Sequence, residues 1–323
     1  MKNPVVAVTW EKHRRMQGLC ARLRLPLFEL THSGGRAARY LWLTWRTIRL
    51  VLAERPRVLL VQNPSIVLTL LALVLRPFGR YRLLVDAHNE AVQPFIHSQW
   101  PVPGLARWLL RRADLTIVTN SKLADEVERA GGRAFVLPDS LPEAPFEETV
   151  LQPTEQALNI MVVSTYAPDE PIADILAVAD RQRDKFRFHI TGNDRKLAPE
   201  LRAGLAPNVR LTGFVPEHDY WLLMRDSHVV LDLTLMPDCL VCGAYEALAA
   251  CRPMILSNND ASRELFGEVA VLAEQGTEGI ERALLTARAN YANLADKMAE
   301  SRTQFEHAWR ARADNLVKWL QET

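Results

Sequence analysis

The sequence predicts an α/β protein with two doubly wound domains, each a parallel sheet covered by helices. Strand-like apolar runs alternate with helical patterns along the whole chain, and a single segment rich in Pro and Glu interrupts the alternation. The 323 residues are enough for two domains. Because 48% of them are hydrophobic and 24% are charged, the composition is that of a globular protein and excludes a disordered chain.

In the first half of the chain, six short runs have the apolar composition of buried parallel strands. Helical patterns at residues 36–53 and 121–130 lie between them, and the second ends at Gly131 and Gly132, as helices often do. The predicted strands are Val5 to Thr9, Pro26 to Leu30, Val58 to Val61, Arg82 to Asp86, Leu115 to Thr119 and Ala134 to Leu137.

Residues 138–153 have no periodicity and read as a linker, after which the alternation restarts. We therefore expect domains at residues 1–145 and 146–302, followed by a terminal helix at residues 303–323. The second set of predicted strands is Leu158 to Ser164, Phe186 to Thr191, Val209 to Thr212, Val229 to Leu233, Pro253 to Leu256 and Val269 to Leu272. Two such domains are expected to face a central cleft.

Four cysteines are too few for a disulfide framework, which suits a reducing compartment. Cys239 and Cys242 form a CxxC, but without a second pair or a nearby His we expect packing residues and no metal site. No secretory signal is visible, so a cytoplasmic location is expected. The apolar stretch from Val58 to Leu75 is broken by polar residues and predicts a strand, a turn and a buried helix rather than a membrane span.

The charge is distributed unevenly. Residues 1–140 hold 21 Lys and Arg against 10 Asp and Glu, a net of +11, and the rest of the chain holds 18 against 28, a net of −10. This pattern favours an anionic membrane surface as a partner, with solvated helix faces as the alternative, and no motif supports nucleic acid. The residues concerned are Arg14, Arg15, Arg22, Arg24, Arg36, Arg39, Arg46 and Arg49, interleaved with Trp10, Leu23, Leu25, Tyr40, Trp42 and Trp45.

Three turns that follow predicted strands in the second half carry residues suited to a nucleotide diphosphate. Small polar groups, glycines and cations allow close backbone approach and offset phosphate charge, and an aromatic residue offers a base a flat surface. Ordinary strand-to-helix turns are the alternative interpretation. The candidate donor-binding residues are Ser164 and Thr165 in the first turn, Gly192, Asn193, Arg195 and Lys196 in the second, and Gly213 and Phe214 in the third.

The stretch 238–256, DCLVCGAYEALAACRPMIL, predicts a helix leading into a buried strand. Asp238 and Glu246 can each accept hydrogen bonds from hydroxyl pairs, and the free N–H groups near Cys242 and Gly243 can meet phosphate. This segment resembles the GT-B glycosyltransferases with two Rossmann-like domains, especially group 1 or family 4. In that family two glutamates, separated by seven residues, hold the donor sugar and the ribose. Here the first is Asp238, and Arg252 replaces a usual glycine.

A second resemblance reaches across both predicted domains. VQNPSIVLTLLAL with LLVDAHNE, at residues 61–90, and VVSTYAPDEPIADIL, at residues 162–176, are similar to the β-1,4-mannosyltransferases acting on lipid-linked chitobiose and to their bacterial exopolysaccharide relatives. The resemblance implies transfer from a GDP- or UDP-linked sugar to a polyprenyl-diphosphate-linked glycan at the inner face of the cytoplasmic membrane. It also implies that the last helix crosses back to the first domain, where we expect it to act as a hinge.

The chemistry is expected to centre on the segment DAHNE. Asp86, His88 and Glu90 follow a predicted strand, and any of them could take a proton from an acceptor hydroxyl in inverting transfer. In retaining transfer His88 would position the donor sugar. No strand-borne Asp-x-Asp is present, so we expect no cofactor and no essential metal, with Arg195 and Lys196 stabilising the leaving group. A sugar-nucleotide epimerase of the same fold and an inactive partner subunit remain alternatives.

Overall fold

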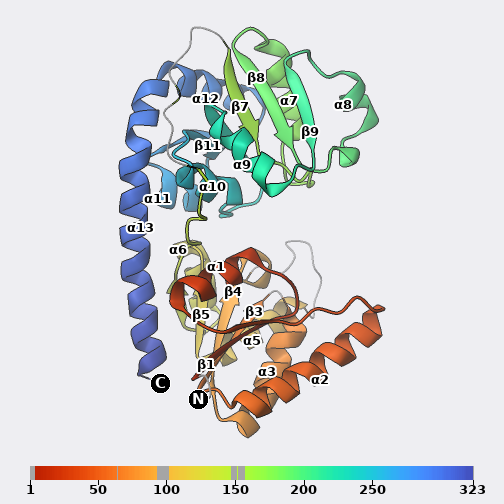
Figure 1. The fold of residues 1–323 in the computed structure, drawn as a ribbon, viewed down its shortest axis with the longest axis vertical. Helices are drawn as coiled ribbons and strands as arrows, with labels where there is room; N and C mark the ends of the chain where they lie inside the picture. Colours follow the sequence, from red (N-terminus) through yellow and green to blue (C-terminus); the bar gives the residue numbers. More distant parts are fainter. Residues whose placement is uncertain (1–3, 64, 93–101, 147–150, 152–156, 323) are drawn as a thin grey trace. The chain divides into compact units, whose positions relative to one another are not determined.

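The computed structural model describes residues 4–63, 65–92, 102–146, 151 and 157–322. It divides into two compact units, the first formed by Met1–Ser140 with His307–Thr323 and the second by Leu141–Glu306. The sequence places these limits at residues 145 and 302. Each unit is a Rossmann-like α/β domain with a parallel sheet of six strands, as predicted (Figure 1).

The first unit contains a sheet in the order β2-β1-β3-β4-β5-β6, in which every pair of neighbours is parallel. The strands are short runs rich in Val, Leu and Ile, because a sheet covered by helices on both faces buries every position. They are β1 (Val5–Thr9), β2 (Leu27–Glu29), β3 (Val58–Asn63), β4 (Arg82–Ala87), β5 (Leu115–Val118) and β6 (Ala134–Val136). All six predicted strands are confirmed.

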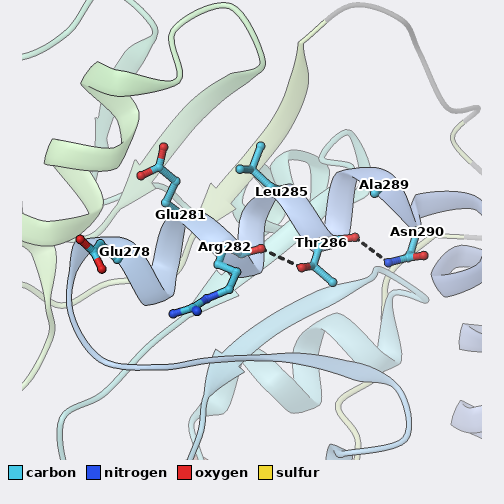
Figure 2. A pocket seen from close by; sticks show the side chains of 7 residues that line it. All are labelled: Glu278, Glu281, Arg282, Leu285, Thr286, Ala289 and Asn290. Carbon is cyan, nitrogen blue, oxygen red and sulfur yellow. Dashed lines mark hydrogen bonds between the residues drawn. The ribbon is translucent and has the colours of Figure 1, made fainter.

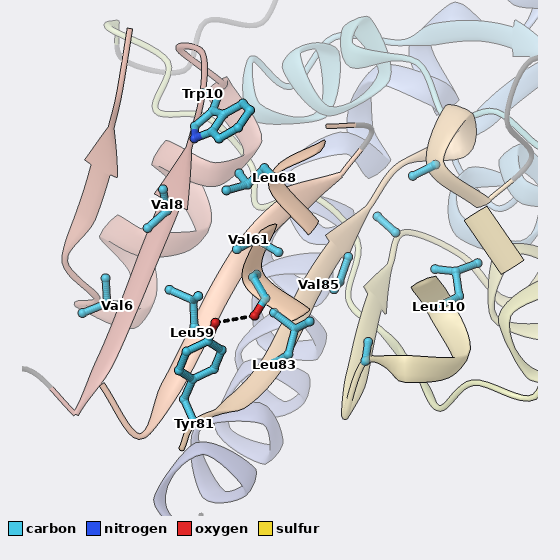
Figure 3. Close-up of a cluster of buried hydrophobic side chains, with 14 of the residues drawn as sticks. Val6, Val8, Trp10, Leu59, Val61, Leu68, Tyr81, Leu83, Val85 and Leu110 are labelled. Atoms are coloured by element: carbon cyan, nitrogen blue, oxygen red, sulfur yellow. Dashed lines mark hydrogen bonds between the residues drawn. The ribbon is translucent and has the colours of Figure 1, made fainter. Parts of the chain in front are cut away.

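Helices connect these strands and cover the sheet. They are α1 (Arg14–Leu23), α2 (Arg36–Glu54), α3 (Ile66–Gly79), α4 (Asn89–Val92), α5 (Val102–Arg112) and α6 (Ser121–Arg129). Side chains from the strands and from α3 form one apolar core, in which the Tyr81 hydroxyl donates to the carbonyl of Ala72 (Figure 3). The stretch from Val58 to Leu75 forms β3 and most of α3, as predicted, but α3 is buried on one side only, because its other side does not face the sheet. No helix in the described part of the chain is long and apolar enough to cross a membrane.

The second unit contains a parallel sheet in the order β12-β11-β10-β7-β8-β9. Its strands are β7 (Leu158–Val162), β8 (Phe186–Thr191), β9 (Val209–Gly213), β10 (Val229–Asp232), β11 (Met254–Ser257) and β12 (Ala270–Ala273), which confirms the second predicted set. Its helices are α7 (Ile172–Arg181), the short 3-10 helix η1 (Asp194–Lys196), α8 (Pro199–Ala203), α9 (Glu217–Arg225), α10 (Cys242–Ala249), α11 (Asp260–Phe266) and α12 (Thr277–Ala289).

The last helix, α13 (Tyr291–Gln321), has residues in both units, since the second unit ends at Glu306. The predicted apolar stripe divides accordingly. Phe305 packs against Tyr245 and Phe266 of the second unit, whereas the buried Trp309 donates from Nε1 to the carbonyl of Pro138 in the first unit at 2.9 Å. A hinge role for this helix stays a prediction.

In each parallel sheet the order in which strands are added reverses at one point, so that successive strands lie on opposite sides of it. The chain leaves β7 toward β8 and β9 on one side and then returns to β10 on the other, while in the first sheet β1 lies between β2 and β3. Loops diverge where the order reverses, so a ligand can reach the carboxyl ends of the strands there. The residues that follow β1, β3, β7 and β10 lie at these points, and β4 lies beside β3.

Candidate active site

In the turn after β7, several groups donate hydrogen bonds to the carboxylate of Glu170. The Ser164 hydroxyl donates to Glu170 at 2.6 Å, and the Thr165 hydroxyl and backbone N–H donate to it at 2.6 and 2.9 Å. The Tyr166 N–H adds a further bond at 2.9 Å. The turn thus places several hydrogen-bond donors around the Glu170 carboxylate. Ser164 and Thr165, which the sequence predicts to bind the donor substrate, both donate to Glu170.

Two glycines bring the neighbouring turn close to this one. Gly192, after β8, has φ of +100°, and a Cβ there would lie 2.1 Å from the carbonyl oxygen of Ser164. Gly213, at the end of β9, has φ of +70° and joins Gly192 through a hydrogen bond from the Gly192 N–H to its carbonyl. Gly192 and Gly213 both have backbone conformations that favour glycine. The missing Cβ at Gly192 lets the turn after β8 lie close to the turn after β7.

The remaining residues of the second and third turns are mostly exposed. Lys196 reaches back to the first turn, where its Nζ donates to the Thr165 carbonyl at 3.0 Å. Asn193 and Arg195 lie on the surface beside it. Phe214 is 89% exposed, so an apolar ring stands open to solvent after β9. The structure therefore brings together the turn residues after β7 and β8.

Helix α10 approaches the end of β10 at Gly243. Its N–H donates to Asp232 Oδ2 at 2.8 Å, and a Cβ at Gly243 would lie only 2.5 Å from that oxygen. One turn further along, the carboxylate of Glu246 is nearly buried and accepts a hydrogen bond from the Tyr220 hydroxyl of α9. A buried carboxylate, a hydroxyl and the N-terminus of a helix are thereby grouped at the reversal point of this sheet.

The electrostatics of this group are set by burial. Burial raises the pKa of Asp232 to about 8, the Gly243 N–H opposes the rise, and the nearby Glu246 adds to it. Burial and Glu246 also raise the pKa of the Tyr220 hydroxyl, so it remains a donor. Asp232 and Tyr220 are not among the residues that the sequence predicts. A carboxylate closing the buried strand VVLD was the available signal for Asp232.

The flanks of α10 differ from the sequence interpretation at two points: Cys242, expected to be a packing residue, is exposed, and the residue with a glycine-like backbone after the helix is Cys251. Asp238 lies in the loop before the helix with a left-handed φ of 51°, and Cys242 is the exposed first residue of α10. After the helix it is Cys251, with φ of 52°, that adopts the conformation glycine favours. Arg252 is 1% exposed and lies in the interior of the unit. The position suited to glycine is thus residue 251, not 252.

In the first unit, Asp86 at the end of β4 is fully buried and paired with Arg15. The Arg15 Nε donates to both carboxylate oxygens, at 2.9 and 3.1 Å. Its Nη1 contacts Asp139, and its Nη2 donates to the Leu137 carbonyl at 3.0 Å. Burial alone would lower the pKa of Arg15, but Asp86 and Asp139 outweigh it and raise the pKa.

The buried positions of Arg15, Trp10 and Asp86 correct three expectations. Arg15 was expected on a membrane-facing surface and instead lies in the interior, because it neutralises the buried Asp86. Trp10 is also buried, and its Nε1 donates to Thr47 at 2.9 Å. An acceptor hydroxyl cannot reach Asp86 as it stands, since the carboxylate is 0% exposed and both oxygens are occupied.

His88 and His13 lie beside this ion pair. The His88 Nε2 is 3.6 Å from Asp86 Oδ2, and the two imidazoles meet edge to face with centroids 4.6 Å apart. Neither His88 Nε2 nor His13 Nδ1 makes a hydrogen bond within the described residues, although both atoms are buried. Burial lowers the pKa of His88 below 6.5, with Asp86 opposing and Arg15 assisting. At neutral pH His88 is therefore a neutral base.

The structure thus brings Asp86 and His88 together and adds Arg15 and His13. His13 follows β1, a strand end that the sequence interpretation leaves without a role. Glu90 lies in α4, but its side chain falls outside the described part of the structure.

A depression of about 560 Å³ lies along α12 in the second unit, and its described lining contains none of these residues (Figure 2). Its lining residues are Glu278, Glu281, Arg282, Leu285, Thr286, Ala289 and Asn290. In the described part of the chain, no group of His, Cys, Asp and Glu is arranged to hold a metal ion.

Comparison with known proteins gives one family match and several solved structures of similar fold. Residues 172–318 match the family model described as "Glycosyl transferase-like". No curated protein matches the sequence. Among solved structures, Anabaena HepE in complex with UDP and glucose has a TM-score of 0.75 at 13% identity and covers 99% of this chain and 100% of its own.

Two further structures have similar coverage. Sucrose-phosphate synthase from Thermosynechococcus elongatus has a TM-score of 0.75 at 13% identity, over 99% of both chains. A protein assigned as a UDP-N-acetylglucosamine 2-epimerase, from Listeria monocytogenes, has a TM-score of 0.62 at 13% identity, over 99% of this chain and 98% of its own. The chain therefore has the GT-B fold, and most of its second unit matches a glycosyltransferase-like family.

Proposed function

We propose that this protein is a glycosyltransferase that moves a sugar from a nucleotide diphosphate sugar to a polyprenyl-diphosphate-linked glycan. The family match over residues 172–318 supports the reaction class, and the UDP bound by HepE supports the nucleotide. The lipid-linked acceptor, its place in exopolysaccharide synthesis and the inner membrane face rest on the resemblance of residues 61–90 and 162–176 to the mannosyltransferases.

The single observation that carries the proposal is the environment of Glu246. Its carboxylate is 8% exposed, is held by the Tyr220 hydroxyl and stands on α10 near the helix N-terminus. We assign it to the ribose hydroxyls, because an ionised carboxylate can accept two hydrogen bonds. The adjacent N–H groups at the start of α10 suit the diphosphate.

Charge on the leaving diphosphate is offset by protein groups in this proposal. Lys196 and Arg195 lie after β8, and the Lys196 ammonium already contacts the first turn. Transfer is then expected to continue in the presence of a chelator such as EDTA. Loss of turnover in EDTA, with recovery on adding a divalent cation, would contradict this part.

We assign the proton-accepting role to His88 rather than to Asp86. The His88 side chain is 26% exposed and its imidazole is neutral at neutral pH, because burial lowers its pKa. Asp86 is buried against Arg15, and its Oδ2 lies 3.6 Å from the His88 Nε2, where its charge acts on the imidazole. His88→Gln should abolish turnover with little change in donor affinity, and parent activity should fall only below pH 6.5, where the imidazole becomes protonated.

An epimerase is the second candidate, because the Listeria protein has the same fold. The two reactions differ in their need for an acceptor. Purified protein should release UDP or GDP from a nucleotide sugar only when a polyprenyl-linked glycan is present. Epimerised sugar nucleotide or free sugar without acceptor would favour the epimerase, and no turnover of any donor would favour an inactive partner subunit.

Removal of Glu246 tests the donor half separately. Glu246→Ala should weaken UDP or GDP binding by about 1 to 3 kcal/mol, the range of a lost charged hydrogen bond. Calorimetry measures this directly. Glu278→Ala, at an exposed position of α12, is the matched control and should bind as the parent does. Equal affinity of both variants would remove the ribose assignment.

A further inference from the structure

Helices α2 and α3 form one continuous outer layer of the first unit. Helix α2 connects β2 to β3 and α3 connects β3 to β4, and both connections move toward the β6 edge of the sheet. Right-handed crossovers in the same direction place their helices on the same face of the sheet. The two helices pack side by side (Figure 1). Their buried residues, including Leu43 and Val51 of α2 and Leu68 and Ala72 of α3, face the sheet. The opposite sides of both helices therefore point outward together.

That outward side is apolar. On α3, Val67, Leu70, Val74 and Phe78 recur at spacings of three and four residues and are all exposed, Val74 by 58% and Phe78 by 76%. On α2, Leu41, Trp45 and Leu52 share one side of the helix, and Leu41 is 73% exposed. An apolar stripe on each of two adjacent helices is unusual for a surface that faces only water.

Cations border the apolar stripes. Arg36, Arg39, Arg46 and Arg49 of α2 are exposed, and Arg80 ends α3. The Arg46 and Arg49 guanidiniums lie over Trp42 and Trp45, 5.4 and 5.0 Å from the ring centroids. Glu54 is the single carboxylate in residues 36–54 and 66–79, where both helices are described, and it is half-buried. The face is thus apolar and cationic.

We propose that this outer face of α2 and α3 docks the protein on an anionic lipid bilayer. The inference deepens the proposed function, on which it rests, by naming the surface that meets the membrane carrying the acceptor. Apolar side chains enter the acyl boundary, tryptophans occupy the interface and arginines pair with lipid phosphates. Nucleic acid would use the arginines but leave the stripe of α3 in water, so the charge and the apolar groups together select lipid.

Vesicle flotation tests the surface without nucleotide or acceptor. The parent protein should float with vesicles of phosphatidylcholine and phosphatidylglycerol at low salt and remain at the bottom with phosphatidylcholine alone. Val74→Ser/Phe78→Ser should lower the bound fraction at least about tenfold, and so should Arg46→Glu/Arg49→Glu. Phe214→Ser and Arg187→Glu/Arg210→Glu, at exposed positions of the second unit, are the matched controls and should float like the parent.

Three outcomes would overturn the inference. Parent-like flotation of both α2 and α3 variants, with circular dichroism showing that they are folded, would mean that another surface binds. A parent dimer that Val74→Ser/Phe78→Ser converts to a monomer without changing flotation would make the face a contact between copies. Duplex DNA binding lost with the arginine pair, while flotation is unchanged, would assign the cations to nucleic acid. Calorimetry with UDP and GDP tests the transferase proposal separately, because it needs no membrane.

Discussion

Arg15 is a buried cation with three partners in the first unit. Its guanidinium joins Asp86, Asp139 and the Leu137 carbonyl, so it links the end of β4 to the segment that follows β6. A buried ion pair gains little net stability compared with apolar packing, but breaking one strands the remaining charge. The pair also acts on His88 electrostatically: burial lowers the pKa of that imidazole, Asp86 opposes the shift and Arg15 adds to it.

Removal of the Arg15 guanidinium should show what it costs to leave Asp86 buried and unpaired. Arg15→Met leaves Asp86 buried without its cation and should cost about 3 to 5 kcal/mol in urea unfolding. The double variant Arg15→Met/Asp86→Asn should recover much of the loss, because no buried charge remains. Arg57→Met, at an exposed position, is the control. A single variant within about 1 kcal/mol of the parent would show that water already reaches Asp86.

Asp232 makes stability depend on pH. Its pKa, raised by burial from 3.8 to about 8, means that the folded state binds a proton in this window that the unfolded chain has released. The free energy of unfolding should therefore fall as pH rises from about 4 to about 8, by at most about 1.4 kcal/mol per unit from this group.

The Asp232→Asn variant keeps a neutral acceptor for the Gly243 N–H and should flatten that profile. Its free energy of unfolding should exceed that of the parent at pH 8 and approach the parent value at pH 4. Denaturant titrations across this range measure the difference. Asp184→Asn, at an exposed loop position, should leave the parent slope unchanged. An Asp232→Asn profile as steep as the parent's would assign the slope to other groups.

At the scale of elements, α10 is the helix that carries Gly243 and Glu246, two of the residues proposed to bind the donor. It has eight residues, and all except Cys242 are buried. Its close approach to β10 depends on Gly243, where a Cβ would lie 2.5 Å from Asp232 Oδ2 and 3.0 Å from Val163 Cγ2. The same approach keeps the helix start, Asp232 and Glu246 within one small volume.

Substituting this glycine tests the packing. Alanine favours helix by about 1 kcal/mol over glycine, but overpacking costs about 1 to 3 kcal/mol, so Gly243→Ala should destabilise the second unit and weaken UDP binding. Thermal unfolding and calorimetry measure the two effects. Gly35→Ala, where a Cβ meets no atom within 4 Å, is the control. A more stable Gly243→Ala protein would show that α10 can shift without loss.

At the scale of the whole molecule, the chain order and the compact units do not coincide. The first unit takes its last segment, His307–Thr323, from the far end of the sequence. Within that segment Trp309, Ala313, Leu316 and Leu320 are buried, and Trp309 bonds to the Pro138 carbonyl. The first unit is therefore incomplete without the C-terminus.

Shortening one of these side chains should affect the first unit alone. Leu316 is 0% exposed, and Leu316→Ala should cost about 2 to 5 kcal/mol. Hydrogen exchange should show faster opening in the first sheet, with unchanged protection in β7 to β12 and unchanged UDP affinity. Arg312→Ala, on the exposed side of α13, should match the parent. Equal loss of protection in both sheets would mean that the units unfold together.

The strands and several candidate site positions could be predicted from the amino-acid order alone. Runs such as Val58–Val61 and Val229–Leu231 are apolar at successive positions, because both faces of a covered parallel sheet are buried. Asp86, His88, Ser164 and Gly192 could be singled out since each follows such a run and so lies at the carboxyl edge.

Packing in three dimensions was needed to establish which of these side chains meet and which make contacts within the protein. Arg15 and Asp86 are 71 residues apart, and Tyr220 and Glu246 are 26 apart. Such pairs form because the strand order brings their loops to the same sheet edge, and that order is set by packing of the whole sheet rather than by local pattern. The same packing buried Arg15, which its surroundings in the sequence placed on the surface, and left the outer sides of α2 and α3 without cover.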